Sequence, residues 1–166
     1  MLGRIVGAVR RNHALEHATI SILMGRLGPD TRLIGRATPT GFYVYGDLPT
    51  DKLEESAKEG LARLQRGEER LAVSPLCGTN LAVAGIMAGL ASLLSAGGNR
   101  SRWEKMPMAL LASMLAVIAA QPMGRWLQKR LTTDADLRDI EIVGVRRADG
   151  GLSRYHKVET SRRAGA

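Results

Sequence analysis

NLAVAGIMAGLASLLSAG at residues 80–97 and PMALLASMLAVIAAQP at residues 107–122 decide the organisation of this chain. They lie inside two windows, Thr79 to Gly98 and Met106 to Gly124, that hold 20 and 19 residues without Asp, Glu, Lys or Arg. A helix needs about 20 apolar residues to cross the core of a bilayer. The sequence therefore predicts a transmembrane helical hairpin, residues 79–98 and 106–124, in contact with the lipid bilayer.

Small residues recur along both helices of the predicted hairpin. Gly85 and Gly89 have GxxxG spacing in the first helix, and Ala109, Ser113 and Ala116 repeat small side chains in the second. In lipid, small side chains let two helix backbones approach closely. We therefore expect tight packing within the hairpin, and a homodimer could form through Gly85 and Gly89. The alternative is a buried helical hairpin of a soluble protein, which would normally show polar faces at helical spacing.

The basic residues that flank the two helices predict the topology. Three of them, Arg100, Arg102 and Lys105, lie in the connection between the helices. Seven lie outside the hairpin: Arg63, Arg66, Arg70, Arg125, Lys129, Arg130 and Arg138. Basic residues concentrate on the cytoplasmic side of membrane proteins, so both termini are predicted to be cytoplasmic. No signal peptide is predicted, because an arginine interrupts the apolar residues of Met1 to Val9.

The composition narrows the classes of function. Of the 166 residues, 45% are hydrophobic and 24% are charged, which is enough for a folded core. The formal charge of +8 points to an anionic partner. Only 4% of the residues are aromatic, however, so platforms that stack bases are not expected and nucleic-acid binding is disfavoured. A single cysteine excludes a disulfide framework and metal sites built from four cysteines.

The segment of residues 1–78 is predicted to combine helices with a β-hairpin. Residues 2–27 have the apolar spacing of an amphipathic helix, and residues 32–46 contain two short strand patterns around Thr38-Pro-Thr40. A second helix is expected from Lys52 to Arg66, with Asp51 and Glu54 at capping-box spacing. The apolar positions of the two helices are Ile5, Val6, Val9, Leu15, Ala18, Ile22 and Leu23, and Leu53, Ala57, Leu61 and Leu64.

Residues 125–160 predict a second β-hairpin that packs on the N-terminal segment. Its strands, Asp139 to Arg146 and Leu152 to Glu159, flank Ala148-Asp-Gly-Gly151, which has the chemistry of a tight turn. The two hairpins are expected to form one four-stranded antiparallel sheet with the helices on one face. The predicted fold class is therefore α+β, a small cytoplasmic unit with a membrane hairpin inserted. The tail of residues 161–166 is predicted to be disordered.

The motif that carries chemistry is His13-Ala-Leu-Glu16-His17, an H-x-x-E-H pattern on the first predicted helix. Residues four positions apart lie on one helix face, so both imidazoles can reach one metal ion. Inverzincin metallopeptidases use this order, with the histidines as ligands and the glutamate as general base. The pattern therefore predicts His13 and His17 as ligands of zinc, and Glu16 as the catalytic base. Iron, manganese, cobalt or nickel would suit the same donors.

A catalytic zinc needs a third protein ligand and an open coordination position. Cys77 is one candidate, because a thiolate there would complete a site of two histidines and one cysteine. The alternative for Cys77 is a small buried residue at a helix N-terminus, with Thr79 or Asn80 as the N-cap. The other candidates are Glu54, Glu55, Glu59, Glu68, Glu69 and His156. A distant glutamate fits the inverzincin pattern, whereas His156, on a predicted strand, is more simply explained as a solvated side chain.

Several short motifs follow the pentad in order: Gly41-Phe42, Gly67-Glu68, Leu71-Ala-Val73 and Cys77-Gly-Thr-Asn80. With Arg11-Asn-His-Ala-Leu-Glu-His17, they make residues 10–125 resemble a family of small bacterial membrane proteins known only as a domain of unknown function. The resemblance implies a multi-pass protein of the bacterial inner (plasma) membrane and singles out the same pentad and cysteine. Members of that family often carry a histidine where this chain has Ser74. The resemblance implies no established activity.

Two functions follow from these patterns. The first is a membrane-anchored metal-binding protein that acts as a zinc-dependent hydrolase on a peptide or protein at the cytoplasmic membrane surface. The second is a non-catalytic membrane protein whose basic helix binds lipid or a protein partner. In that case the pentad is only a polar face, and Arg4, Arg10 and Arg11 would meet lipid phosphates. Glu16→Gln separates the two, because it would abolish hydrolysis and spare the metal only under the first.

Overall fold

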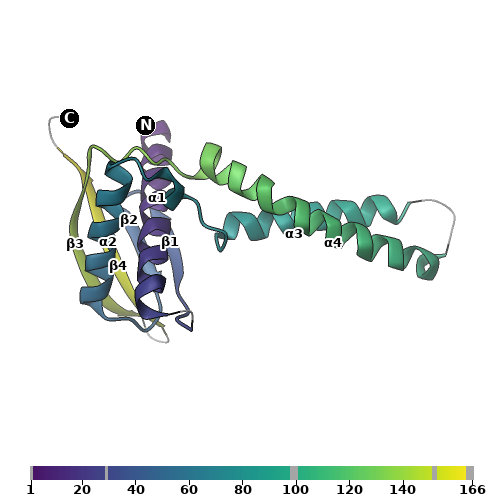
Figure 1. Cartoon of the computed structure of the whole chain (residues 1–166), viewed down its shortest axis with the longest axis horizontal. Helices are drawn as coiled ribbons and strands as arrows, with labels where there is room; N and C mark the ends of the chain where they lie inside the picture. The colour runs from purple at the N-terminus through teal and green to yellow at the C-terminus, as the bar shows by residue number, and fades with distance from the viewer. Residues whose placement is uncertain (1, 29, 98–100, 151–152, 164–166) are drawn as a thin grey trace. The chain divides into compact units, whose positions relative to one another are not determined.

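The computed structural model describes residues 2–28, 30–97, 101–150 and 153–163 (Figure 1). The chain divides into two compact units, one made of residues 1–74 and 129–166 and the other of residues 75–128. Within the described residues the first unit combines helices with a four-stranded antiparallel sheet, and the second is a helical hairpin. The α+β class predicted from the sequence is therefore confirmed.

The sheet of the first unit is built from two hairpins. Its strands are β1 (Ile34–Thr38), β2 (Gly41–Tyr45), β3 (Ile140–Gly150) and β4 (Ser153–Arg162). Neighbouring strands are antiparallel in the order β1-β2-β4-β3. The two hairpins join through β2 and β4, where Val44 lies opposite His156. This pairing unites the segments that precede and follow the helical hairpin into one domain.

Helices α1 (Leu2–Leu27) and α2 (Thr50–Gln65) cover one face of this sheet (Figure 1). The core between the helices and the sheet contains Leu15, Ala18, Leu23, Phe42, Val44, Leu53, Ala57, Leu61, Leu64 and Val158. The apolar stripe predicted for α2 is thus confirmed. On α1, however, Ile5 and Val6 are 43% and 49% exposed. The buried residues of α1 begin at Asn12, so its first turns project past the core.

A glycine sets how closely the two helices approach each other. A Cβ atom at Gly60 of α2 would lie 3.2 Å from the Cβ of Ala18 on α1. This is tighter than most contacts between side chains in a packed interior, so a larger residue would push the helices apart. The crossing at Gly60 therefore holds α1 against the core at Ala18, the residue that directly follows the histidine pentad.

The start of α2 differs from the predicted capping box. The helix begins at Thr50, and Pro49 stands at the N-cap without a side-chain hydrogen bond, so Asp51 lies in the first turn instead of capping it. The hydroxyl of Thr50 is engaged elsewhere, because its Oγ1 lies 2.9 Å from Nε2 of His156 on β4. The prediction of a cap at Asp51 is therefore wrong, and a contact to the sheet fixes this helix end.

The ends of β3 and β4 lie farther out than predicted. Asp149 and Gly150 pair with Arg154 and Ser153, so the predicted turn residues 148–150 belong to the strand and residues 151–152 lie outside the described part. At the other end, Arg162 pairs with Ile140. Ser161 and Arg162 are thus ordered in β4, and the prediction of disorder from Ser161 is wrong for these two residues. The long partner strand β3 accounts for the extension.

The second unit consists of α3 (Gly78–Ser95) and α4 (Arg102–Leu127). Both helices are long and apolar enough to cross a membrane, and only 6% of the residues in each apolar window are buried. Large apolar side chains are exposed along both helices, among them Leu94 at 83% and Trp103 at 79%. Residues 98–100 of the predicted turn lie outside the described part. A core helix of a soluble protein would instead be mostly buried.

The close contact inside the hairpin is not made by Gly85 and Gly89. A Cβ atom at either position would meet nothing within 4 Å among the described residues. The backbones approach instead at Gly124 of α4, where a Cβ atom would lie 2.9 Å from Cγ of Asn80. Asn80 accepts a hydrogen bond of 2.8 Å from Nε2 of Gln128. The predicted role of Gly85 and Gly89 within the hairpin is therefore wrong, and their face of α3 stays open.

Candidate metal centre

His13 and His17 lie one turn apart on α1, with their ring centroids 4.3 Å apart. The helix is continuous from Leu2 to Leu27, so the spacing of four residues puts both rings on the same face. His17 is only 4% exposed, and His13 is partly buried. The two imidazoles are therefore close neighbours on one helix face, as the sequence pattern predicts, and the structure adds that they are largely shielded from solvent.

A backbone carbonyl group orients each imidazole. Nδ1 of His13 lies 2.9 Å from the oxygen of Thr132, and Nδ1 of His17 lies 2.8 Å from the oxygen of Ala72. A carbonyl oxygen only accepts hydrogen bonds, so each Nδ1 carries a proton and donates it. In the neutral ring this leaves the lone pair on Nε2. Metal-binding histidines typically have this arrangement, in which the second hydrogen bond fixes tautomer and ring orientation.

The ends of two short irregular helices present these carbonyl groups. The 3₁₀ helix η1 (Glu69–Ala72) ends at Ala72, and the π-helical turn η2 (Gln128–Thr132) ends at Thr132. The last carbonyl groups of a helix have no partner within it, so they are available to the imidazoles. Arg10 links η2 and the residue after it to α1, because its Nη2 donates hydrogen bonds to the carbonyl oxygens of Arg130 at 3.1 Å and Thr133 at 2.9 Å. The turn η2, which orients the ring of His13, is therefore itself hydrogen-bonded to α1.

Glu16 is 6% exposed, and its carboxylate packs on the backbone of Gly35 in β1. A Cβ atom at Gly35 would lie 2.7 Å from Cγ of Glu16 and would overlap its carboxylate. The position therefore accepts glycine alone without a shift of the glutamate. The sequence analysis did not identify Gly35, although an isolated glycine in a strand often marks a close approach of this kind.

Most glutamates considered as the third ligand are held in ion pairs on the surface. The pairs are Glu54 with Lys58, Glu55 with Lys52 and Arg26, Glu59 with Arg26 and Arg63, and Glu68 with Arg66 and Arg70. Glu69 lines a pocket of about 230 Å³ together with Arg10, Ala72 and Asp136. In the described part of the chain, none of these carboxylates belongs to the group of metal-type donors that contains the histidine pair.

The pocket beside Ala72 carries fixed charges of both signs. Arg10 and Lys129 line it, and so do Glu69 and Asp136. The hydrogen bond from the side chain of Arg138 lowers the pKa of Asp136 to about 2. The carboxylate of Asp136 is therefore ionised at neutral pH and already engaged by an arginine. This pocket offers a polar approach to the segment that holds His17.

His156 is not the solvated side chain that the sequence predicted. It is 1% exposed, and its Nε2 lies 2.9 Å from the hydroxyl oxygen of Thr50. The alternation along β4 explains this, because His156 has the same phase as the buried Val158 and faces the helices. His156 therefore joins the sheet to the start of α2, which is a structural role.

Cys77 belongs to the second unit and stands at the N-cap of α3. Its Sγ accepts a hydrogen bond of 3.5 Å from the backbone nitrogen of Thr79, so the cap is Cys77 rather than Thr79 or Asn80. Along the chain, Cys77 follows Ala72 by five residues, and the carbonyl group of Ala72 orients His17.

Comparison with known proteins identifies relatives without an assigned activity. Residues 8–145 match a family described as a domain of unknown function, DUF6391. An uncharacterized protein of Picosynechococcus sp. is 32% identical in an alignment that covers 75% of this chain and 65% of that relative. The chain thus spans less than two thirds of the relative's length. No solved structure matches the chain.

Proposed function

This chain belongs to the DUF6391 family, whose name assigns no activity, and we propose from the geometry of its histidine pair that it is a membrane-anchored metal-binding protein. The hydrogen bonds from both Nδ1 atoms to backbone carbonyl groups carry the proposal, because they leave Nε2 as the donor atom of each ring. Zinc is the first choice of metal, since imidazole is one of its preferred ligands.

We propose Cys77 as the third ligand. Cys77 is the single cysteine of the chain and would add a thiolate to the two imidazoles. Imidazole nitrogen and thiolate sulfur are both common ligands of zinc. The short connection supports the assignment, since five residues after Ala72 reach at most about 18 Å. The chain therefore keeps Cys77 within that distance of Ala72, whose carbonyl group orients His17.

Glu16 gives this centre the chemistry of a hydrolase. A bound zinc ion would polarise a water molecule and lower its pKa. Glu16 lies next to His17 in the sequence, is 6% exposed, and packs its carboxylate against Gly35. Such a carboxylate would take the proton of the attacking water, the role of the glutamate in metallopeptidases. The proposed substrate is a peptide or protein at the cytoplasmic membrane surface.

Titration with zinc tests the metal and the third ligand together. The full chain is purified in detergent, stripped of metal with EDTA and titrated with Zn²⁺ by calorimetry, and we expect one site per chain. Cys77→Ser should weaken zinc binding at least about 10-fold, since a ligand contributes no less than an outer-shell partner. In the Co²⁺ form, the near-ultraviolet band of a thiolate ligand should disappear in Cys77→Ser.

Two results would contradict these proposals separately. If the wild type binds no Zn²⁺, Co²⁺, Fe²⁺, Mn²⁺ or Ni²⁺, the metal site is wrong, and the non-catalytic protein that binds lipid or a partner becomes the better explanation. If Cys77→Ser binds zinc as tightly as the wild type and the Co²⁺ form shows no thiolate band, the histidine site stands. In that case another group is the third ligand.

We also propose that α3 and α4 cross the bacterial inner membrane with both termini in the cytoplasm. Their apolar windows are only 6% buried, so the surface that they present suits lipid. More basic residues flank the hairpin outside the connection than within it, which favours this orientation. The open face around Gly85 and Gly89 is where we propose that a second copy packs.

Reporter fusions in bacterial cells test the orientation. Alkaline phosphatase, which folds only outside the cytoplasm, should be active when fused after Ser101 and inactive when fused after Thr133. Green fluorescent protein should show the opposite pattern. Active phosphatase at both positions would contradict the crossing by α4, and inactive phosphatase at both would contradict insertion of the hairpin.

A further inference from the structure

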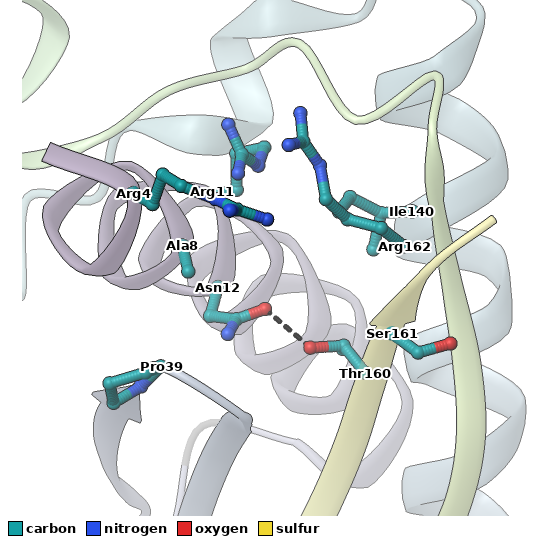
Figure 2. Close-up of a pocket in the computed structure, with 9 residues that line it drawn as sticks. All are labelled: Arg4, Ala8, Arg11, Asn12, Pro39, Ile140, Thr160, Ser161 and Arg162. Atoms are coloured by element: carbon teal, nitrogen blue, oxygen red, sulfur yellow. Dashed lines mark hydrogen bonds between the residues drawn. The ribbon is translucent and has the colours of Figure 1, made fainter. Parts of the chain in front are cut away.

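A pocket of about 210 Å³ in the first unit gathers three arginines (Figure 2). Arg4 and Arg11 come from α1, and Arg162 comes from the end of β4. Among the described residues, no acidic side chain lines this pocket. The arginine pocket plays no part in the proposed metal centre, so its function is a separate question.

The floor of the arginine pocket is rigid. Asn12 is 2% exposed, and its Nδ2 donates a hydrogen bond of 2.7 Å to the oxygen of Thr38. Its Oδ1 accepts a hydrogen bond of 2.7 Å from the hydroxyl group of Thr160 (Figure 2). These bonds link α1 to β1 and β4. Ala8 lies between Arg4 and Arg11 on the same face of α1, and its small side chain leaves the space open.

The charges around the pocket are only partly balanced. Arg162 is bonded to Asp139, with Nη2 2.6 Å from Oδ2. The side chain of Arg11 is 14% exposed, but its nearest carboxylate, on Asp134, is 3.7 Å away, which is too long for a hydrogen bond. Nε of Arg11 is buried and has no hydrogen-bond partner among the described residues. Buried donors are normally satisfied, so an orphaned guanidinium nitrogen points to a missing acceptor.

We propose that the arginine pocket binds a phosphate group. Guanidinium groups pair with phosphate oxygens in bidentate geometry, and three of them suit an anion with several oxygens and more than one charge. A carboxylate, in contrast, is paired by a single guanidinium group through two parallel hydrogen bonds. The volume of about 210 Å³ is below the range of roughly 300–1,000 Å³ of pockets for drug-sized ligands, so a single phosphate group fits better than a nucleotide. The phosphate can be free in solution or part of a lipid headgroup.

The test uses two exposed arginines of the pocket and a matched pair elsewhere. Arg4→Gln/Arg162→Gln removes two charges from the pocket, and Arg66→Gln/Arg154→Gln removes two from other surfaces of the same unit. All proteins are full-length, in detergent and free of metal, because phosphate binds zinc. One arm titrates inorganic phosphate by calorimetry at constant ionic strength. The other counts phosphatidylglycerol bound in native mass spectra, with phosphatidylcholine for comparison.

We expect the pocket pair to weaken binding at least about 10-fold, because each lost guanidinium removes charge-assisted hydrogen bonds. The control pair should keep an affinity within about two-fold of the wild type, since exposed charges far from the pocket are screened by salt. Arg4→Lys/Arg162→Lys keeps the positive charges but loses the bidentate guanidinium geometry, so its affinity should lie between those of the wild type and the glutamine pair. Thermal unfolding of each ligand-free variant checks that it is folded.

Each outcome decides the proposal. Binding of inorganic phosphate with this pattern identifies a soluble ligand. Selective binding of phosphatidylglycerol with this pattern identifies a lipid headgroup. An equal loss in the control pair would show general attraction to a basic surface and would overturn the proposal, as would binding to neither ligand. Because metal is absent throughout, failure here leaves the proposed metal centre untouched.

Discussion

Replacing both His13 and His17 by alanine is expected to abolish zinc binding. Loss of an outer-shell partner alone typically costs about 10–100-fold in metal affinity, so loss of two ligands should lower it by more than about 1,000-fold. Both rings are oriented by hydrogen bonds to backbone carbonyl groups, and among the described residues no carboxylate belongs to the donor group that contains them. The measurement is the zinc content of detergent-purified protein by elemental analysis, with calorimetric titration of the stripped protein.

His156→Ala is the matched control for the loss of a buried imidazole. It removes the contact to Thr50 and should cost about 1–3 kcal/mol of stability, but it should keep one zinc ion per chain. His17→Asn removes the imidazole but is expected to keep the fold, because an amide can still donate a hydrogen bond to the carbonyl group of Ala72. It therefore separates loss of a ligand from unfolding. One zinc ion per chain in the double alanine variant would place the metal elsewhere and refute the proposed centre.

The helix that carries the pentad could be predicted because its signals are local. Spacing of four residues puts His13 and His17 on one face whatever surrounds them. The same holds for the stripe of α2, where Leu53, Ala57 and Leu61 are buried as expected. The spacing of residues within one helix is enough to predict which of them share a face, so no knowledge of the elements that pack on the helix is needed.

The groups that orient the histidines could not be predicted. The carbonyl oxygens of Ala72 and Thr132 lie 55 and 119 residues from their partners along the chain. Every residue has a carbonyl group, so the sequence does not show which of them accept hydrogen bonds from the histidines. The spacing of the pentad thus predicts the ligands, whereas their tautomers follow only from the tertiary fold.

Strand β3 shows a second limit of pattern analysis. Ile142 and Val145 both pack against the core although they are three positions apart. A β-bulge between Ile142 and Gly144 adds one residue against β4, so Val145 instead of Gly144 returns to the face of Ile142. Strict alternation would place the residues beyond the bulge on the wrong face. The bulge depends on the partner strand, so the sequence of β3 alone does not locate it.

Gly35→Ala is expected to remove hydrolytic activity while one zinc ion per chain is kept. The new methyl group would overlap the carboxylate of Glu16, which is nearly buried and must therefore shift. A displaced general base costs about 10²–10⁴-fold in rate, and the overpacking costs about 1–3 kcal/mol of stability. Activity is measured as cleavage of a mixture of internally quenched peptides by the zinc-loaded protein, and zinc content is measured on the same sample.

Two variants show whether this loss acts through Glu16. Gly25→Ala adds the same methyl group on α1, where a Cβ atom would meet nothing within 4 Å among the described residues, so activity should be unchanged and stability equal or up to about 1 kcal/mol higher. Glu16→Gln should lose as much activity as Gly35→Ala, and the double variant should lose no more, because both changes remove one group. Full cleavage by Gly35→Ala and Glu16→Gln would exclude Glu16 as the base. Loss of zinc in both would instead make Glu16 a ligand, since a base that only moves a proton leaves the metal in place.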